Sequence, residues 1–110
     1  MKLITSIVRA DRVEDVTHAL GQLHVLGLVA VPVQDYTPQP HPADVWRGRA
    51  YIRAYSMKME IRFAVADEIV DDAIGVILRT ARTGCAGDGF VSVQPMDDRY
   101  NIGTRTREVP

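Results

Sequence analysis

The residues best suited to chemistry lie in one stretch, Arg82-Thr83-Gly84-Cys85-Ala86-Gly87-Asp88-Gly89-Phe90, which we call the glycine loop. It places three glycines and an aspartate within six positions. Glycine lets the backbone take left-handed conformations and approach a ligand closely, and a turn of this kind can aim several N–H groups at one anion. The alternative interpretation is a helix C-cap followed by a tight turn, which requires no ligand.

The elements on either side of the glycine loop would hold it in place. Before it, Asp67 is expected to cap a helix that ends at Gly84 and carries an apolar stripe of Val70, Ala73, Ile74, Ile77 and Ala81. After it, residues 90–95 (FVSVQP) are predicted to form a strand. The glycine loop therefore connects a helix to a strand.

The first part of the chain predicts the same succession of elements. Residues 2–9 are rich in branched apolar side chains and predict a strand. The next helix should start at Asp11, with Glu14 completing a capping box, and end by Gly27. Residues 28–33 should form a second strand, which Pro32 places at an edge of the sheet.

Residues 57–66 alternate between apolar and polar side chains and predict a third strand, whose outer face carries Lys58, Glu60, Arg62 and Ala64. Between the second and third strands lies a loop of about 20 residues, 36–55, which is unusual in a compact domain and is typically functional or disordered. The tail from residue 96 shows no strong pattern. The element order predicts a single α+β domain over residues 1–110, a ferredoxin-like βαββαβ sandwich with both helices on one face of the sheet. Its other face needs a cover, either water or another subunit.

The composition limits the classes of function. The chain has 110 residues, 46% of them apolar, and a net charge of −1, so it has no overall attraction for nucleic acid or anionic membrane. Its single cysteine excludes an internal disulfide framework and a cysteine zinc site. No apolar run approaches the ~20 residues of a membrane span, and the start has no signal-peptide core. We expect a soluble cytoplasmic protein.

Several motifs together resemble the P-II signal-transduction proteins. Thr83-Gly84-x-x-Gly87-Asp88-Gly89 resembles the B-loop of that family, which corresponds to the glycine loop. Residues 1–4, residues 66–71, and Arg47-Gly48 followed by Tyr51 match as well, and the match covers residues 1–95 without a gap. The resemblance implies a homotrimer that binds ATP or ADP in clefts between subunits. It also implies that the long loop, the family's T-loop, docks onto a transporter, an enzyme or a regulator.

The resemblance assigns nucleotide contacts to Ile7, Gly87, Asp88 and Gly89, whereas ordinary members have a phosphate-binding lysine where this chain has Phe90. Losing that cation removes a charge-assisted contact of ~1.5–3 kcal/mol, so we expect ADP or AMP to be favoured over ATP. The family also uses two arginines spaced R-x-R after its last core strand. The ungapped register places them at Asn101 and Gly103; Arg105 and Arg107 have the same spacing four residues later, and they either take that role or are unrelated solvated charges.

In the long loop, the resemblance assigns Gln39 and Lys58 to 2-oxoglutarate and its metal, with the need for magnesium left open. The prolines at positions 38, 40 and 42 lack the N–H groups that the family uses there, which argues against ordinary 2-oxoglutarate sensing. Tyr51 matches a position that some members uridylylate, although its sequence context differs. The expected partner surface of the loop is His41, Trp46, Arg47 and Tyr51.

These expectations favour a regulatory module over an enzyme, with a small anion such as bicarbonate as a candidate effector. The alternatives are an ordinary nitrogen-regulatory P-II protein that senses ATP, ADP and 2-oxoglutarate, and a slow nucleotide hydrolase. The hydrolase is disfavoured because the sequence offers no nucleophile–base pair and no Walker lysine. RNA binding would need stacking aromatic residues on the central strands, and the sequence places none there.

Overall fold

The computed structural model describes the backbone of residues 1–37, 40–46, 49–52 and 55–110, and the side chains of residues 1–37 and 55–110. Its main elements are β1 (Lys2–Arg9), α1 (Val13–Leu20), β2 (Leu26–Asp35), β5 (Ser56–Val65), α2 (Val70–Ala81) and β6 (Gly89–Pro95). A short 3-10 turn precedes each helix, over Ala10–Arg12 and Asp67–Ile69.

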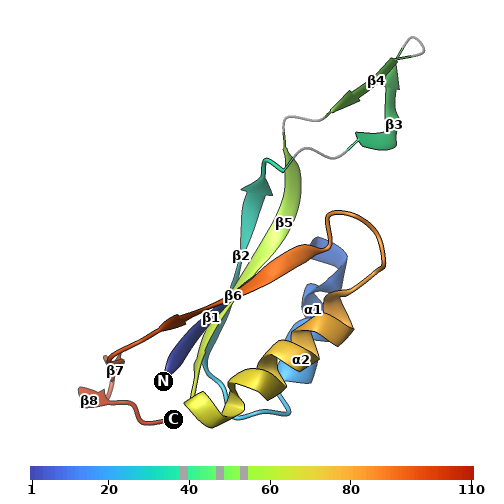
Figure 1. Ribbon diagram of the computed structural model, residues 1–110. Helices are drawn as coiled ribbons and strands as arrows, with labels where there is room; N and C mark the ends of the chain where they lie inside the picture. The colour runs from blue at the N-terminus through green and yellow to red at the C-terminus, as the bar shows by residue number, and fades with distance from the viewer. Residues whose placement is uncertain (38–39, 47–48, 53–54) are drawn as a thin grey trace.

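These strands form one antiparallel sheet in the order β2-β5-β1-β6, and both helices cover the same face of it (Figure 1). This arrangement confirms the predicted ferredoxin-like sandwich. It also confirms that the strand containing Pro32 is an edge strand, where a missing backbone N–H costs least.

The core lies between the sheet and the helices, as the alternation in the strands requires. In β1, Ile4, Ser6 and Val8 face the helices, opposite Phe63, Ile61 and Met59 of β5 respectively. The helices contribute Val16, Leu20, Ala73 and Ile77, all of which are buried. The predicted stripe of the second helix is therefore the stripe that packs on the sheet.

Two expectations about the helix ends were wrong. Asp11 does not cap α1: it lies in the 3-10 turn, and neither that turn nor α1 has a side-chain cap hydrogen bond. The helix ends at Leu20, before Gly27, and its C-cap is Gly21 in a right-handed conformation, so Gly27 is not the cap. Gly27 instead has a φ of 65° at an irregularity in the pairing of β2 with β5, where the Arg99 guanidinium occupies the space that a Cβ would need.

Asp67 is likewise no side-chain cap for the second helix. Its carboxylate pairs with the N-terminal ammonium of the chain at 3.0 Å, which lowers the pKa of Asp67. This contact fixes the start of β1 against the turn before α2.

Two additional hairpins complete the described structure. Within the long loop, β3 (Pro40–Trp46) pairs with β4 (Arg49–Ile52), and this hairpin projects beyond the ends of β2 and β5 (Figure 1). In the tail, β7 (Tyr100–Asn101) pairs with β8 (Thr106–Arg107). The tail therefore has a local structure that its polar sequence did not predict.

Candidate functional site

The glycine loop connects the end of α2 to β6, as predicted, and three of its residues need glycine geometry. Gly84, Gly87 and Gly89 have φ angles of 87°, 87° and 107°, in the left-handed region that other residues avoid. At Gly89, an added Cβ would lie 1.7 Å from the carbonyl oxygen of Ile7. Glycine at position 89 therefore lets β6 begin directly beside β1.

Asp88 stabilises the conformation of the glycine loop by accepting hydrogen bonds from other residues of the loop. Its carboxylate accepts hydrogen bonds from the backbone N–H groups of Thr83 at 2.8 Å and Gly84 at 3.1 Å, and from the Thr83 hydroxyl. The Arg9 guanidinium donates a further bond from Nε at 2.9 Å. The hydrogen bond from the Thr83 hydroxyl has the largest effect and that from Arg9 the next largest; together they hold the pKa of Asp88 well below its ordinary value. Asp88 is therefore ionised at neutral pH.

Arg9 also ties the far side of the loop to the sheet. Its Nη2 donates to the Ala86 carbonyl oxygen at 2.8 Å, while its Nε holds Asp88. Sequence analysis missed Arg9, because nothing in its position at the end of a strand indicates a partner 79 residues away. Arg9 and Asp88 together make the loop a preformed structure.

The backbone amides of Ala86 and Gly87 are candidate donors to a ligand. Among the hydrogen bonds between described residues, none is donated by the backbone N–H of Ala86 or Gly87. Backbone N–H groups in such a turn are donors for an anion such as a phosphate. Asp88 therefore shapes the loop, and the amides beside it are its candidate ligand contacts.

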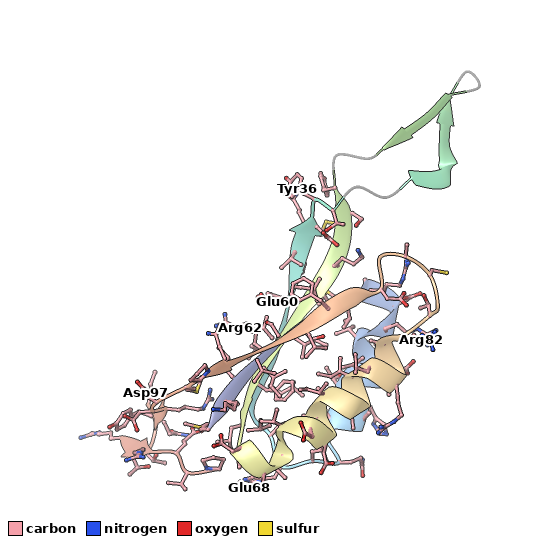
Figure 2. All side chains as sticks on the ribbon, in the orientation of Figure 1. Tyr36, Glu60, Arg62, Glu68, Arg82 and Asp97 are labelled. Atoms are coloured by element: carbon pink, nitrogen blue, oxygen red, sulfur yellow. The ribbon has the colours of Figure 1, made fainter. Side chains whose placement is uncertain are left out.

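A cavity of 340 Å³ lies below the loop, between the C-terminal half of α2 and the edge of the sheet. This volume is within the range of small-molecule sites. Its lining includes four residues of the predicted nucleotide set, together with side chains of α2: Ile7, Asp88, Gly89, Phe90, Ile77, Leu78, Ala81 and Arg82. Figure 2 shows Arg82 at this end of the molecule.

Ser6 lines the same cavity and contributes an unusual group. The residue is fully buried, yet its hydroxyl oxygen has no hydrogen-bond partner within the described part of the chain. An unpaired buried hydroxyl is costly. Ser6 is a second feature that sequence analysis did not identify, since a serine in a strand carries no such signal.

Phe90 lies where the resemblance expects a lysine. It is the second residue of β6, opposite Ile7, and 60% of its surface is exposed. The rim of the cavity therefore carries an aromatic ring at the position where the resemblance leads us to expect an ammonium group.

The two tail arginines are not near the glycine loop of the same chain. Arg107 lies in β8 and pairs with Asp98 at 3.0 Å, and Arg105 is exposed with a φ of 59°. The β7–β8 hairpin is at the end of the sheet opposite the glycine loop (Figure 1), and Figure 2 shows Asp97 there and Arg82 at the other end. Within one chain the structure does not bring the two sets together.

Lys58 lies on the outer face of β5, as the alternation predicts, but it is buried there. It is 3% exposed, and its ammonium group donates to the Asp35 carboxylate at 2.8 Å and to the Ser56 hydroxyl at 3.3 Å. Further along the same face of β5, Glu60 is half-buried, and Arg62 projects into solvent on the side away from the helices (Figure 2). Within one chain, Lys58 is therefore shielded from solvent, because Asp35 at the end of β2 covers it.

The remaining residues predicted in the long loop fall outside what the structure describes. Gln39 and Arg47 lie outside the described backbone. The backbone of His41 and Trp46 belongs to β3 and that of Tyr51 to β4, but their side chains are outside the described set. Their roles remain predictions.

Among the described residues, no three His, Cys, Asp or Glu side chains are grouped so that they could hold a metal ion. In the same part of the chain, no helix has the length and apolar character needed to cross a membrane.

Comparison with known proteins decides the family. The family model described as "Nitrogen regulatory protein P-II" matches residues 1–108. The chain belongs to the P-II family. The nitrogen regulatory protein P-II of Rhizobium etli is 33% identical over 104 residues, 94% of this chain and 93% of the relative. The nitrogen regulatory protein GlnK of Escherichia coli K12 gives the same identity and coverage, and P-II 1 of that strain is 33% identical over 93 residues, 84% of this chain and 83% of the relative.

Membership in the P-II family confirms the resemblance inferred from the glycine loop and the strand motifs. The chain is therefore a signal-transduction protein of the P-II type.

Proposed function

We propose that this protein binds an adenine nucleotide at the glycine loop and regulates a target transporter or enzyme through its long loop. The observation that supports this proposal most directly is the cavity below the glycine loop. Ile7, Asp88, Gly89 and Phe90, assigned to nucleotide binding from the sequence, all line it. The unpaired amides of Ala86 and Gly87 supply donors for a phosphate, and the apolar lining suits a base.

The proposed order of affinity places ADP or AMP above ATP. Phe90 supplies no positive charge at the position where a lysine would meet the phosphates. The triphosphate of ATP carries the most negative charge, so ATP loses the most binding free energy when the cation is missing. ADP and AMP lose less binding free energy.

The proposal includes a homotrimer, because the glycine loop of one chain lacks the tail arginines. Arg105 and Arg107 are at the opposite end of the sheet, so only another subunit can place them beside a nucleotide. In this arrangement, a neighbouring subunit covers the sheet face that the helices leave open.

A small anion, bicarbonate or 2-oxoglutarate, is the proposed effector. Any anion that binds the Lys58 ammonium group must compete with the Asp35 carboxylate, which already pairs with it at 2.8 Å. We therefore expect effector binding at Lys58 to be weak in the unmodified chain.

An ordinary nitrogen-regulatory role is the second candidate. The names of the related proteins, nitrogen regulatory protein P-II and GlnK, favour it. It requires tight ATP binding and coupling between ATP and 2-oxoglutarate. Slow nucleotide hydrolysis is a weaker third candidate.

Titration calorimetry separates these candidates. ADP, AMP and ATP are titrated into the protein in separate experiments, each with and without 2-oxoglutarate or bicarbonate, while free phosphate is assayed. Binding that favours ADP or AMP without phosphate release supports the proposal. ATP binding that 2-oxoglutarate strengthens supports the nitrogen-regulatory role, phosphate release supports the hydrolase, and no binding of any nucleotide contradicts the proposal.

A further inference from the structure

Ser6 is a polar residue at a position that the fold assigns to the core. It lies in the middle of β1, between Ile4 and Val8. Its partners in the neighbouring strands are Ile61 of β5 and Val91 of β6. Ile4, Val8 and Ile61 are buried apolar residues. The alternation of β1 therefore places a hydroxyl group where a small apolar side chain would serve the core equally well.

The Ser6 hydroxyl destabilises the protein when no ligand is bound. The residue is 0% exposed, and its hydroxyl oxygen has no hydrogen-bond partner within the part of the chain that the structure describes. Such a hydroxyl has lost its hydrogen bonds to water and has gained none in return. Because alanine or cysteine at position 6 would avoid this cost, stability does not explain the serine.

Ser6 lines the 340 Å³ cavity below the glycine loop. Its side chain points to the helix side of the sheet, where Ile77 and Ala81 of α2 form the facing part of the lining. These two residues and Val91 are apolar, so a ring that enters the cavity meets apolar surface on both sides. The Ser6 hydroxyl therefore adds a single polar group to an apolar compartment.

The other polar side chains of the cavity are not equivalent to Ser6. Arg82 is exposed, so water satisfies its guanidinium group. The Asp88 carboxylate already accepts hydrogen bonds from Thr83 and Arg9. Among the described side chains that line the cavity, Ser6 is therefore the buried one whose hydrogen-bonding capacity is unused.

Ser6 lies at a depth that separates it from the proposed phosphate contacts. In the β1–β6 pairing, Val8 is opposite Gly89, the last glycine of the glycine loop, and Ser6 is opposite Val91. Two residues along a strand span about 7 Å. A nucleotide whose phosphate meets the loop amides therefore reaches Ser6 with its base and not with its phosphate.

We propose that Ser6 is a specificity-determining residue of this site, whose hydroxyl forms a hydrogen bond with a nitrogen on the edge of the ligand's base. The inference rests on the proposed nucleotide function. A hydroxyl both donates and accepts hydrogen bonds, so it pairs with a ring nitrogen or with an exocyclic amine. Binding supplies the partner that Ser6 lacks in the free protein. A ligand without a base leaves the hydroxyl unpaired and is therefore disfavoured.

Ser6→Ala tests this assignment, because a binding role and a structural role predict opposite changes in stability. ADP and ribose 5-phosphate, which has no base, are titrated separately by calorimetry into the unmodified protein and the variant at one ionic strength. We expect Ser6→Ala to bind ADP at least tenfold more weakly, with no change in its affinity for ribose 5-phosphate. The melting temperature of ligand-free Ser6→Ala should equal or exceed that of the unmodified protein.

Two further variants locate the effect. Ser6→Cys keeps a small side chain but replaces the hydroxyl by a thiol, which is a weak hydrogen-bonding group. It should therefore lose ADP affinity as Ser6→Ala does. Ser92→Ala removes an exposed hydroxyl from β6, one that donates to the Thr5 carbonyl oxygen at 3.4 Å and does not line the cavity. This control should bind ADP as tightly as the unmodified protein.

The outcomes separate the Ser6 inference from the proposed function. The inference is overturned by unchanged ADP affinity in Ser6→Ala and Ser6→Cys, by an equal loss in Ser92→Ala, or by an equal loss of affinity for ribose 5-phosphate. A Ser6→Ala protein that melts at a lower temperature, or does not fold, also overturns it, because the hydroxyl then has a structural role. ADP binding that does not depend on Ser6 leaves the proposed function standing, whereas no binding of ADP, AMP or ATP to the unmodified protein removes both.

Discussion

Replacing Phe90 by lysine tests whether this position sets the nucleotide preference. The Phe90 ring is 60% exposed at the rim of the cavity, so the substitution removes little buried surface and presents an ammonium group where a phosphate is proposed to lie. A charge-assisted hydrogen bond contributes ~1.5–3 kcal/mol. Because the position is more exposed than buried, we take the lower end, ~1.5 kcal/mol, which is about tenfold in affinity. We therefore expect Phe90→Lys to bind ATP about tenfold more tightly, with a smaller gain for ADP.

The assay is calorimetric titration of ATP and ADP into the unmodified protein, Phe90→Lys and Phe90→Met at one ionic strength. Methionine is a flexible, uncharged control for loss of the ring. A folded Phe90→Lys protein whose ratio of ATP to ADP affinity is unchanged would refute the reasoning. An equal gain in Phe90→Met would show that removal of the ring, and not the new charge, is responsible.

Three further predictions concern the loop and its surroundings. Gly89→Ala should destabilise the protein far more than Gly84→Ala in urea unfolding. Both positions need a positive φ, which costs ~1–2 kcal/mol for alanine, but only at Gly89 would the new Cβ collide with another atom, 1.7 Å from the carbonyl oxygen of Ile7. Equal losses of stability in the two variants would contradict this prediction. Ser6→Ala should raise the free energy of unfolding by ~1 kcal/mol, because it removes a buried unpaired hydroxyl; a loss of stability would show that the hydroxyl has a partner. The pKa of Asp35 is lowered from 3.8 to about 2, so the ionised Asp35 carboxylate contributes fully to stability above about pH 5, and this contribution is lost as the pH falls from about 4 to 2. In urea unfolding, the free energy of unfolding should therefore fall more steeply over this pH range in the unmodified protein than in Asp35→Asn.

The sheet and its helices could be predicted because their signals are local and repeated. Alternation in residues 57–66 and the stripe from Val70 to Ala81 each fix which side of an element faces the core, and the order of elements then leaves few topologies. The helix ends were harder to predict. Asp11 had the residue type of a cap, but the chain enters α1 through a 3-10 turn, so that side chain is not at the cap position.

The candidate site was predictable only in its backbone. The glycines indicated positive φ angles, and Gly84, Gly87 and Gly89 have them. The ion pairs could not be foreseen, because each joins residues that are distant in the sequence: Arg9 with Asp88, and Lys58 with Asp35. Alternation placed Lys58 on the outer face correctly, but it could not show that a carboxylate from the neighbouring strand end would bury it.

The central claim, that the glycine loop binds an adenine nucleotide, is tested most directly by following backbone amide resonances while ADP is added to isotopically labelled protein. The account predicts saturable shifts concentrated at residues 82–90, with the amides of Ala86 and Gly87 among the largest, and a similar response at Ile7. Saturable binding that leaves these resonances unmoved, or no binding of ADP, AMP or ATP at all, would contradict it.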